Sequence, residues 1–220
     1  MSSVPLPVTD AENRTSVRGA YAQSASAGTP APTPAPDAIG VLIVVPTLDA
    51  GAADAGAVEL TRILMQAGQR AVVVSRAGRL AADVTAAGAE FVPLDVASNN
   101  PIVMLRNAVI LRRLARERRC DIIHALGRSA AWSAFIAARL GGTRFVTSWY
   151  KGFREQNLFK RLYNGVMARG DRVIAASEQI AQLINDRYGT PWDKIAVVPC
   201  SIDLERFDPA RVGAGRVDAI

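Results

Sequence analysis

The stretch VLIVVPTLDAGAADAGAVEL, residues 41–60, decides the fold of this chain. It begins with five consecutive apolar residues, passes through a loop of small residues and enters a helical pattern that we place at residues 54–67. A short apolar run of this kind is typical of a strand buried on both faces, and a helix directly after it forms the first half of a βαβ unit. The stretch therefore predicts a parallel sheet covered by helices.

The same alternation of apolar runs and helical patterns continues along the chain. We expect strands at residues 41–45, 71–75, 90–94, 121–125, 144–149, 172–177 and 194–199. We expect helices at residues 54–67, 79–87, 102–118, 129–140, 157–168 and 178–188. This order predicts an α/β fold, a single Rossmann-like, doubly wound parallel sheet of about seven strands with helices on both faces.

The two ends of the chain differ from this pattern. Residues 1–38 lack bulky side chains and end in ASAGTPAPTPAPDA, so we expect a disordered Pro/Ala-rich tail, followed by the Rossmann-like domain over 39–199. Near the other end, VVPCSIDLERFDP (197–209) passes from a strand into Pro199 and mixed polar residues, which is typical of a chain leaving a domain. We interpret residues 200–220 as the remnant of a hinge or linker.

Composition excludes several classes of protein. The chain has 220 residues, of which 50% are hydrophobic and 21% charged, so most of it should fold around a core. No apolar run reaches the roughly 18 residues of a membrane span, and no secretory signal is evident. Cys120 and Cys200 lie far apart without metal spacing, as expected of a reduced cytoplasmic protein without a metal site. The net charge of +6 admits phosphates, nucleotides, nucleic acid or acidic lipid as partners.

Ligands of doubly wound sheets bind at the carboxyl ends of the strands, near the switch in strand order. The loop after the first strand, PTLDAGAAD (46–54), has small residues and opens a helix, so its backbone N–H groups could face an anion, with Gly51 and Asp54 as candidate site residues. The alternative is that the small residues only allow the helix to pack. The loop is not GxGxxG and no acidic residue closes the second strand, which disfavours a dinucleotide dehydrogenase.

The loop after the fourth strand holds the only histidine, His124, with Arg128 and Ser129 just beyond it. A guanidinium near the start of a helix suits a phosphate or a carboxylate. For His124 two interpretations stay open, a site residue at the ligand edge of the sheet or a packed structural residue. The sequence predicts that Arg128 and Ser129 belong to the site.

The loop after the fifth strand, WYKGFREQN (149–157), interleaves aromatic and charged residues. Aromatic faces beside cationic donors suit a sugar ring or a phosphorylated acceptor, and Tyr150, Lys151 and Arg154 are the candidates. Single-stranded nucleic acid is a second interpretation. A third is that the aromatic residues cap the core while the charged ones are solvated.

The segment MLRNAVILRRLARERR (104–119), most of which falls in the expected helix over 102–118, carries six arginines. One side of it is apolar, and most of the arginines spread over another side. We interpret the basic side as the solvated face of a helix that covers the sheet. Peripheral contact with an anionic membrane is the alternative.

One family shows the same segments in the same order. The segments are VLIVVPTLDAGAADAGAVEL, DIIHALGRSAAWSA, FVTSW, RLYNGVMARGDRVIAASE and VVPCSIDLERFDP. Together they resemble the N-terminal half of family-4 retaining glycosyltransferases, from about Ile39 to Pro209, and look closest to bacterial members that build lipopolysaccharide or exopolysaccharide. The resemblance implies the two-Rossmann-domain GT-B fold. It also implies an N-terminal domain that mainly binds the acceptor and a C-terminal domain that holds the nucleotide-sugar donor as co-substrate, with no metal and no other cofactor.

The sequence departs from the family pattern at several positions. Ala52 stands where relatives usually have a second glycine, and Leu126 stands where many relatives have a second histidine. Trp149-Tyr150-Lys151 stands where relatives often read Tyr-His-Gly. The Asn-Gly of the family hinge is replaced by Cys200-Ser201. A His-assisted role is therefore not carried over, and we assign no catalytic residue.

Three hypotheses for function follow. The leading one is the acceptor-binding half of a retaining glycosyltransferase, which folds alone but transfers no sugar without a donor-binding domain. The alternative is a stand-alone module that binds a glycolipid or sugar phosphate, or that partners a separate donor-domain chain. A nucleic-acid module rests only on charge and the strand-five loop and is disfavoured. If the sheet edge faces a cleft, we expect Trp149, Tyr150 and Phe153 to be at least partly exposed together.

Overall fold

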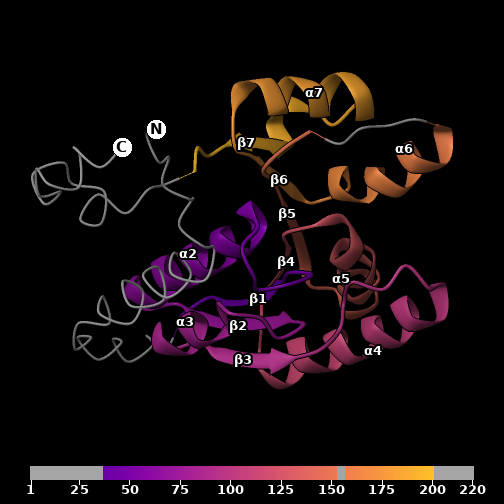
Figure 1. Cartoon of the computed structure of the whole chain (residues 1–220). Helices are drawn as coiled ribbons and strands as arrows, with labels where there is room; N and C mark the ends of the chain where they lie inside the picture. The colour runs from indigo at the N-terminus through magenta and orange to yellow at the C-terminus, as the bar shows by residue number, and fades with distance from the viewer. Residues whose placement is uncertain (1–36, 153–156, 201–220) are drawn as a thin grey trace, which may run out of the picture. The chain divides into compact units, whose positions relative to one another are not determined.

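The computed structural model describes residues 37–152 and 157–200, which alternate strands and helices along one sheet (Figure 1). The strands are β1 (Gly40–Val44), β2 (Arg70–Ser75), β3 (Glu90–Pro93), β4 (Ile122–Ala125), β5 (Arg144–Trp149), β6 (Arg172–Ala175) and β7 (Ile195–Val197). The α-helices are α2 (Ala52–Gln66), α3 (Ala81–Ala86), α4 (Pro101–Glu117), α5 (Arg128–Gly141), α6 (Leu158–Asn164) and α7 (Glu178–Tyr188), and two short 3-10 helices are η1 (Gly165–Ala168) and η2 (Trp192–Lys194). The expected tail up to residue 36 and the hinge remnant from residue 201 lie outside the described residues.

The seven strands form one parallel sheet in the order β3-β2-β1-β4-β5-β6-β7. The chain moves outward from β1 through β2 to β3, then returns across β1 to β4 and continues outward to β7. The direction of winding thus switches between β1 and β4, whose registers pair Ile43 with His124. This arrangement confirms the predicted doubly wound Rossmann-like fold. It also places the loops after β1 and β4 side by side at the carboxyl edge.

Helices cover the sheet on both faces, and the apolar strands require this cover. In β1, Leu42 and Val44 point into the core beneath α4, α5 and α7, while Val41 and Ile43 point into the core beneath α2 and α3. All four side chains are at most 5% exposed. Figure 1 shows the helices divided between the two faces in this way. Because side chains alternate along a strand, a continuous apolar run fits only a sheet with two covered faces.

The observed helices begin and end close to the predicted positions. Asn100 caps α4 by accepting a hydrogen bond from the Ile102 N–H at 2.9 Å, and Pro101 occupies the first turn, where no intrahelical partner is lost. The expected helix over 157–168 is divided into α6 and η1 at Gly165, a residue of low helix propensity. Within the described ranges, no helix is both long and apolar enough to cross a lipid bilayer.

Candidate functional site

A cleft of about 600 Å³ opens at the carboxyl edge of the sheet, beside the switch between β1 and β4. Its walls come from the first loop, the start of α5, the end of β5 and the α6–η1 segment. Six of the predicted site residues line it: Gly51, Asp54, Arg128, Ser129, Tyr150 and Lys151. Arg154 lies outside the described residues. The three loops named from the sequence therefore meet around one cavity, at the edge where ligands of such sheets bind.

The first loop closes on the carboxylate of Asp54, which is buried. Its Oδ2 accepts hydrogen bonds from the backbone N–H groups of Asp49, Ala50 and Gly51 at 3.0, 3.2 and 3.0 Å. The Thr47 hydroxyl donates to both carboxylate oxygens, at 3.2 and 3.0 Å. We expected the backbone N–H groups of this loop to face an anionic ligand. They are instead occupied by the carboxylate of Asp54 from the same chain. Asp54 fixes the shape of the cleft wall, and its negative charge is satisfied by the loop.

His124 lies beneath the cleft. Its Nε2 is 2.8 Å from the Oγ of Ser148, a residue that lines the cavity. Burial of the imidazole lowers its pKa from 6.5 to about 4, so the ring is neutral at physiological pH. His124 therefore supports the floor of the cleft through Ser148. This position fits the structural interpretation that the sequence left open.

His124 makes the stability of the domain depend on pH between about 4 and 6.5. In this range the unfolded chain binds a proton at His124 and the folded chain does not, so stability is lost as the pH falls from 6.5 towards 4. The full difference is about 3 kcal/mol. The chain has one histidine. In H124Q, the difference in free energy of unfolding between neutral pH and about pH 4.5, measured with urea, should therefore be smaller than in the wild type by this contribution. An unchanged difference between the two pH values would contradict the assignment.

Arg128 opens α5 at the rim of the cleft. Its Nη1 donates to the Oδ1 of Asn164 at 3.1 Å, and this buried asparagine ends α6. The Trp132 indole donates to the Tyr163 carbonyl at 3.0 Å, and the Tyr163 hydroxyl donates to Asn99 Oδ1 at 2.6 Å. These bonds tie α5, α6 and the segment before α4 together. The guanidinium of Arg128 is thereby held at the cavity rather than left to sample solvent.

The end of β5 corrects one expectation. Trp149 is only 1% exposed, its indole donates to the Met167 carbonyl at 3.0 Å, and its ring packs against Tyr188. The predicted exposed group of three aromatic residues is therefore wrong for Trp149, because β5 is still covered on both faces at its last residue. Phe153 lies outside the described residues. The ring of Tyr150 is half-buried and lies against α2.

Tyr150 and Lys151 form the strand-five side of the mouth. Burial raises the pKa of the Tyr150 hydroxyl to about 12, with a smaller rise from Cys200 and an opposing effect of Ser148. The hydroxyl therefore stays protonated at neutral pH and can donate a hydrogen bond to a ligand. Lys151 is exposed beside it. The pair offers an aromatic edge and a cation to the same cavity.

Gly127 brings the first and fourth loops into contact, and sequence reasoning missed it. Its φ is +152° and its ψ is 147°, a conformation essentially restricted to glycine, and a Cβ atom there would lie 2.8 Å from Cγ of Pro46. We expect G127A to destabilise the domain by about 2–5 kcal/mol, from backbone strain and the contact together. Chemical denaturation of the wild type and G127A measures this loss in the free energy of unfolding.

Gly142 provides the matched control for Gly127. It has φ +70°, and a Cβ atom there would meet nothing within 4 Å. G142A should therefore cost only the conformational strain, about 1–2 kcal/mol. Equal losses in the two variants would show that the contact between Gly127 and Pro46 contributes nothing.

Several other residues of the cleft were not predicted. They are Asn99, Ser148, Lys160, Tyr163 and Asn164. Lys160 follows the strand-five loop on α6 and adds a third cation to Arg128 and Lys151 at the cavity. Its helix was predicted, but which side of the helix faces the cleft depends on the packing of α6 against α5.

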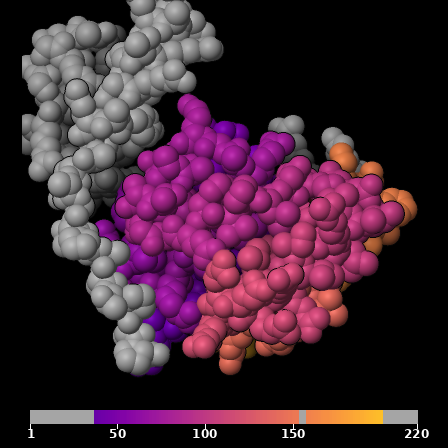
Figure 2. All heavy atoms as spheres, turned by 90° about the horizontal axis from the view of Figure 1, so that it is seen from below, coloured from indigo at the N-terminus to yellow at the C-terminus, as the bar shows by residue number. Residues whose placement is uncertain are grey.

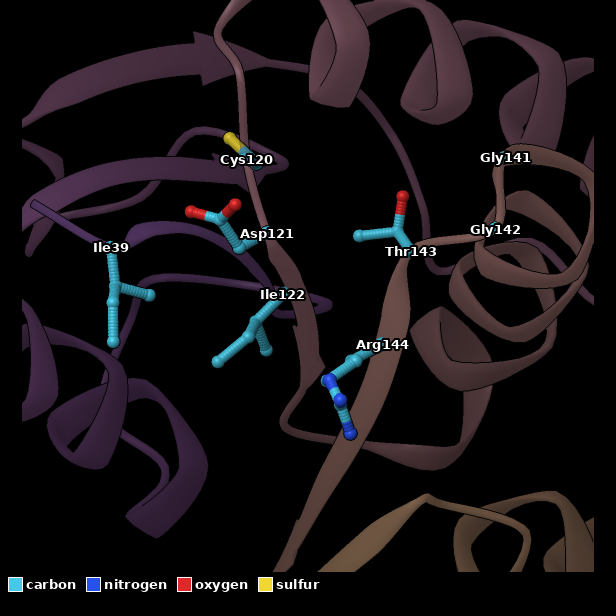
Figure 3. A pocket seen from close by; sticks show the side chains of 8 residues that line it. All are labelled: Ile39, Cys120, Asp121, Ile122, Gly141, Gly142, Thr143 and Arg144. Carbon is cyan, nitrogen blue, oxygen red and sulfur yellow. The ribbon is translucent and has the colours of Figure 1, made fainter. Parts of the chain in front are cut away.

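A second hollow, of about 500 Å³, lies at the opposite edge of the sheet, where β4 and β5 begin (Figure 3). Its polar side chains point in different directions, with the Cys120 thiol and the Arg144 guanidinium directed away from each other. Asp121 accepts a hydrogen bond from the Gly40 N–H at 2.8 Å. Burial raises the pKa of the Cys120 thiol to about 11, so it is not a nucleophile at neutral pH. The polar side chains that line this hollow therefore do not converge on one point where a ligand could bind.

A doubly wound parallel sheet with a cleft at the switch in strand order defines a Rossmann-like domain. The chain belongs to Glycosyltransferase Family 4, whose family model matches residues 54–206. This membership confirms the resemblance to the N-terminal half of a family-4 glycosyltransferase with the GT-B fold. No curated protein matches the sequence at a significant level.

Solved structures of glycosyltransferases share this fold. A glycosyltransferase from Rickettsia africae is 26% identical, with a TM-score of 0.70 over 83% of this chain and 48% of its own. Anabaena Alr3699/HepE, solved in complex with UDP-glucose, is 17% identical, with a TM-score of 0.65 over 82% of this chain and 50% of its own. The lipopolysaccharide outer core galactosyltransferase WaaB is 14% identical, with a TM-score of 0.56 over 76% of this chain and 47% of its own. The chain thus spans about half the length of these proteins.

Proposed function

We propose that this domain binds the acceptor of a retaining glycosyltransferase that transfers a sugar from a nucleotide-sugar donor during cell-surface polysaccharide or lipopolysaccharide synthesis in the cytoplasm. One observation carries the proposal: Arg128, Lys151 and Lys160 line a single cleft at the ligand edge of a family-4 fold. Among the described residues that line the cleft, Asp54 is the acidic one, and backbone N–H groups already engage its carboxylate. The three cationic side chains favour an anionic ligand, such as a phosphorylated sugar.

The proposed reaction breaks the bond between the anomeric carbon and the donor diphosphate and forms one between that carbon and the acceptor oxygen. The proton of the acceptor hydroxyl passes to an oxygen of the departing diphosphate. Neither ionisable group closest to the floor of the cleft suits that proton, since Asp54 holds the first loop and His124 is buried and neutral. The cleft is suited to positioning an acceptor and neutralising its charge. We infer that the donor nucleotide is held mainly by a second domain, whose groups would stabilise the departing diphosphate.

Calorimetric titration tests the binding role. Glucose 1-phosphate should bind the 220-residue chain at least about tenfold more tightly than glucose, since one charged hydrogen bond is worth about 1.5–3 kcal/mol. The preference should weaken as salt concentration rises. Equal affinity for the two sugars, or no binding of either, would contradict the proposal.

An activity assay separates the enzyme from the alternative of a stand-alone binding module. With UDP-glucose as donor, we expect no transfer by this chain alone and transfer when a family-4 donor-binding domain is supplied. Sugar transfer by this chain alone would contradict the proposal that a second domain mainly holds the donor nucleotide. Binding of the sugar phosphate without transfer under either condition would favour the binding module.

A further inference from the structure

Gly56 stands inside α2, where a glycine is less favourable for the helix than an alanine would be. The structure shows what the missing side chain makes room for. A Cβ atom at Gly56 would overlap the hydroxyl oxygen of Tyr150 and would lie 2.5 Å from Cζ of the same ring. The phenol of Tyr150 thus packs end-on against the backbone of α2. Gly56 provides the space that the phenol occupies.

Ser148 holds the Tyr150 hydroxyl from a second direction. The two residues stand two positions apart at the end of β5, so their side chains leave the chain on the same side, and both line the cleft. Burial raises the pKa of the Tyr150 hydroxyl, and the hydrogen bond with Ser148 opposes this rise. A partner that lowers the pKa of a phenol stabilises its ionised form, which is the effect of a hydroxyl that donates to the phenol oxygen.

His124 fixes the direction of these hydrogen bonds. Its Nε2 is buried and lies 2.8 Å from the Oγ of Ser148. The serine has one proton, which it donates to Tyr150, so its oxygen accepts from His124 in the tautomer that carries the proton on Nε2. The bonds therefore run from His124 through Ser148 to Tyr150. This order leaves the proton of the Tyr150 hydroxyl for a ligand in the cleft.

We propose that Tyr150 is a specificity-determining residue of the cleft, whose hydroxyl is presented to the ligand as a hydrogen-bond donor. Gly56, Ser148 and His124 are the positioning residues that hold it there. A hydroxyl fixed as a donor, beside the ammonium group of Lys151, requires an oxygen acceptor on the ligand, and a phosphate oxygen is a strong one. The contact with the ligand rests on the proposed function, whereas the positioning of the phenol does not.

Thermal unfolding without ligand tests the role of Gly56. In the wild type, G56A should lower the melting temperature, because the added methyl group displaces the phenol. In a Y150A background, the same change should raise the melting temperature by about 2–4 °C, because alanine then only improves the helix. Tyr150 is half-buried, so the Y150A background keeps most of the core. A shift of the same sign in both backgrounds would overturn the positioning role.

Gly141 is the matched control, a helical glycine at the opposite edge of the sheet. It ends α5 beside Arg112 of α4, the helix that spreads across the face shown in Figure 2. A Cβ atom at Gly141 would lie 3.3 Å from Thr143 Oγ1 and 3.5 Å from Arg112 Cγ. G141A should therefore change the melting temperature equally in the wild type and in Y150A. If its effect also reversed between the backgrounds, the reversal at Gly56 would not support a contact with Tyr150.

Calorimetric titration with glucose 1-phosphate tests the contact with the ligand. Y150F removes only the hydroxyl and should lower the affinity by about fivefold or more. S148A should lower it by a similar factor in the wild type and hardly at all in Y150F, because Ser148 acts through that hydroxyl. Y188F removes the hydroxyl of a tyrosine on α7 that does not line the cleft, and its affinity should stay within about twofold of the wild type.

Two results of the titration count against the proposal. An affinity of Y150F equal to that of the wild type would exclude Tyr150 as a ligand contact while leaving the proposed function in place. Equal losses from S148A with and without the Tyr150 hydroxyl would show that Ser148 does not act through it. Failure of the wild type to bind glucose 1-phosphate would contradict the proposed function and the ligand contact together. The unfolding comparison needs no ligand, so it decides the role of Gly56 in either case.

Discussion

Replacing both Arg128 and Lys151 by alanine should lower the affinity for glucose 1-phosphate by roughly a hundredfold or more. Both residues line the same cleft, and each charged hydrogen bond to a phosphate is worth about 1.5–3 kcal/mol, or roughly ten- to a hundredfold in affinity. Single substitutions should each show part of the loss. Lys151 is exposed, so K151A should leave the melting temperature nearly unchanged, and calorimetric titration measures the affinity.

Arg116 supplies the control for this double variant. It is exposed in the last turn of α4, so R116A removes one positive charge without removing a side chain that lines the cleft. We expect its affinity for glucose 1-phosphate to remain within about twofold of the wild type, since a screened charge at that distance contributes little. If R116A weakened binding as much as R128A, the net charge of the domain, and not the cleft, would explain the affinity.

Replacing Asp54 by alanine should destabilise the domain by about 2–4 kcal/mol. The carboxylate accepts from three backbone N–H groups and from the Thr47 hydroxyl, and charged hydrogen bonds of this kind are each worth about 1.5–3 kcal/mol. Water reaches the exposed loop and compensates for part of the loss. D54N keeps an acceptor oxygen without the charge and should be intermediate. Urea unfolding of the wild type, D54A and D54N measures these differences in the free energy of unfolding.

Asp83 is the matched control for Asp54. It also lies in the first turn of a helix, α3, so D83A removes a carboxylate that favours the helix dipole and should cost only about 0.3–1 kcal/mol. Equal losses in D54A and D83A would show that Asp54 acts through the dipole alone. The larger loss that we expect would show that the first loop takes its shape from its own carboxylate.

The fold could be predicted because each strand is a short apolar run that must be buried on both faces. The runs VLIVV and AVVVS leave no polar face for solvent, and the helices between them supply the cover. The location of the cleft followed from topology, since carboxyl ends of parallel strands share one edge. Residues that directly follow the strands, such as Arg128 and Lys151, were therefore found.

The remaining features of the candidate site depend on tertiary contacts, which cannot be read from the sequence. Asp54 was predicted as a ligand residue, but its carboxylate turns back on the loop that precedes it, a geometry that no spacing indicates. Trp149 looked exposed because it ends a strand, yet Tyr188 of α7 covers it. Lys160 was missed because a side chain joins the cleft only once α6 is packed and rotated against its neighbours.

Chemical-shift mapping of the backbone amides during titration with glucose 1-phosphate tests the central claim most directly. We expect the largest shifts in the first loop (46–54), at 126–129 where α5 begins, at 148–151 at the end of β5 and at 160–164 on α6, because each of these segments contributes residues that line the cleft. R128A should reduce these shifts at the same ligand concentration. Shifts confined to the opposite edge, around Cys120 and Thr143, or no saturable shifts at all, would contradict a ligand site at the carboxyl edge of the sheet.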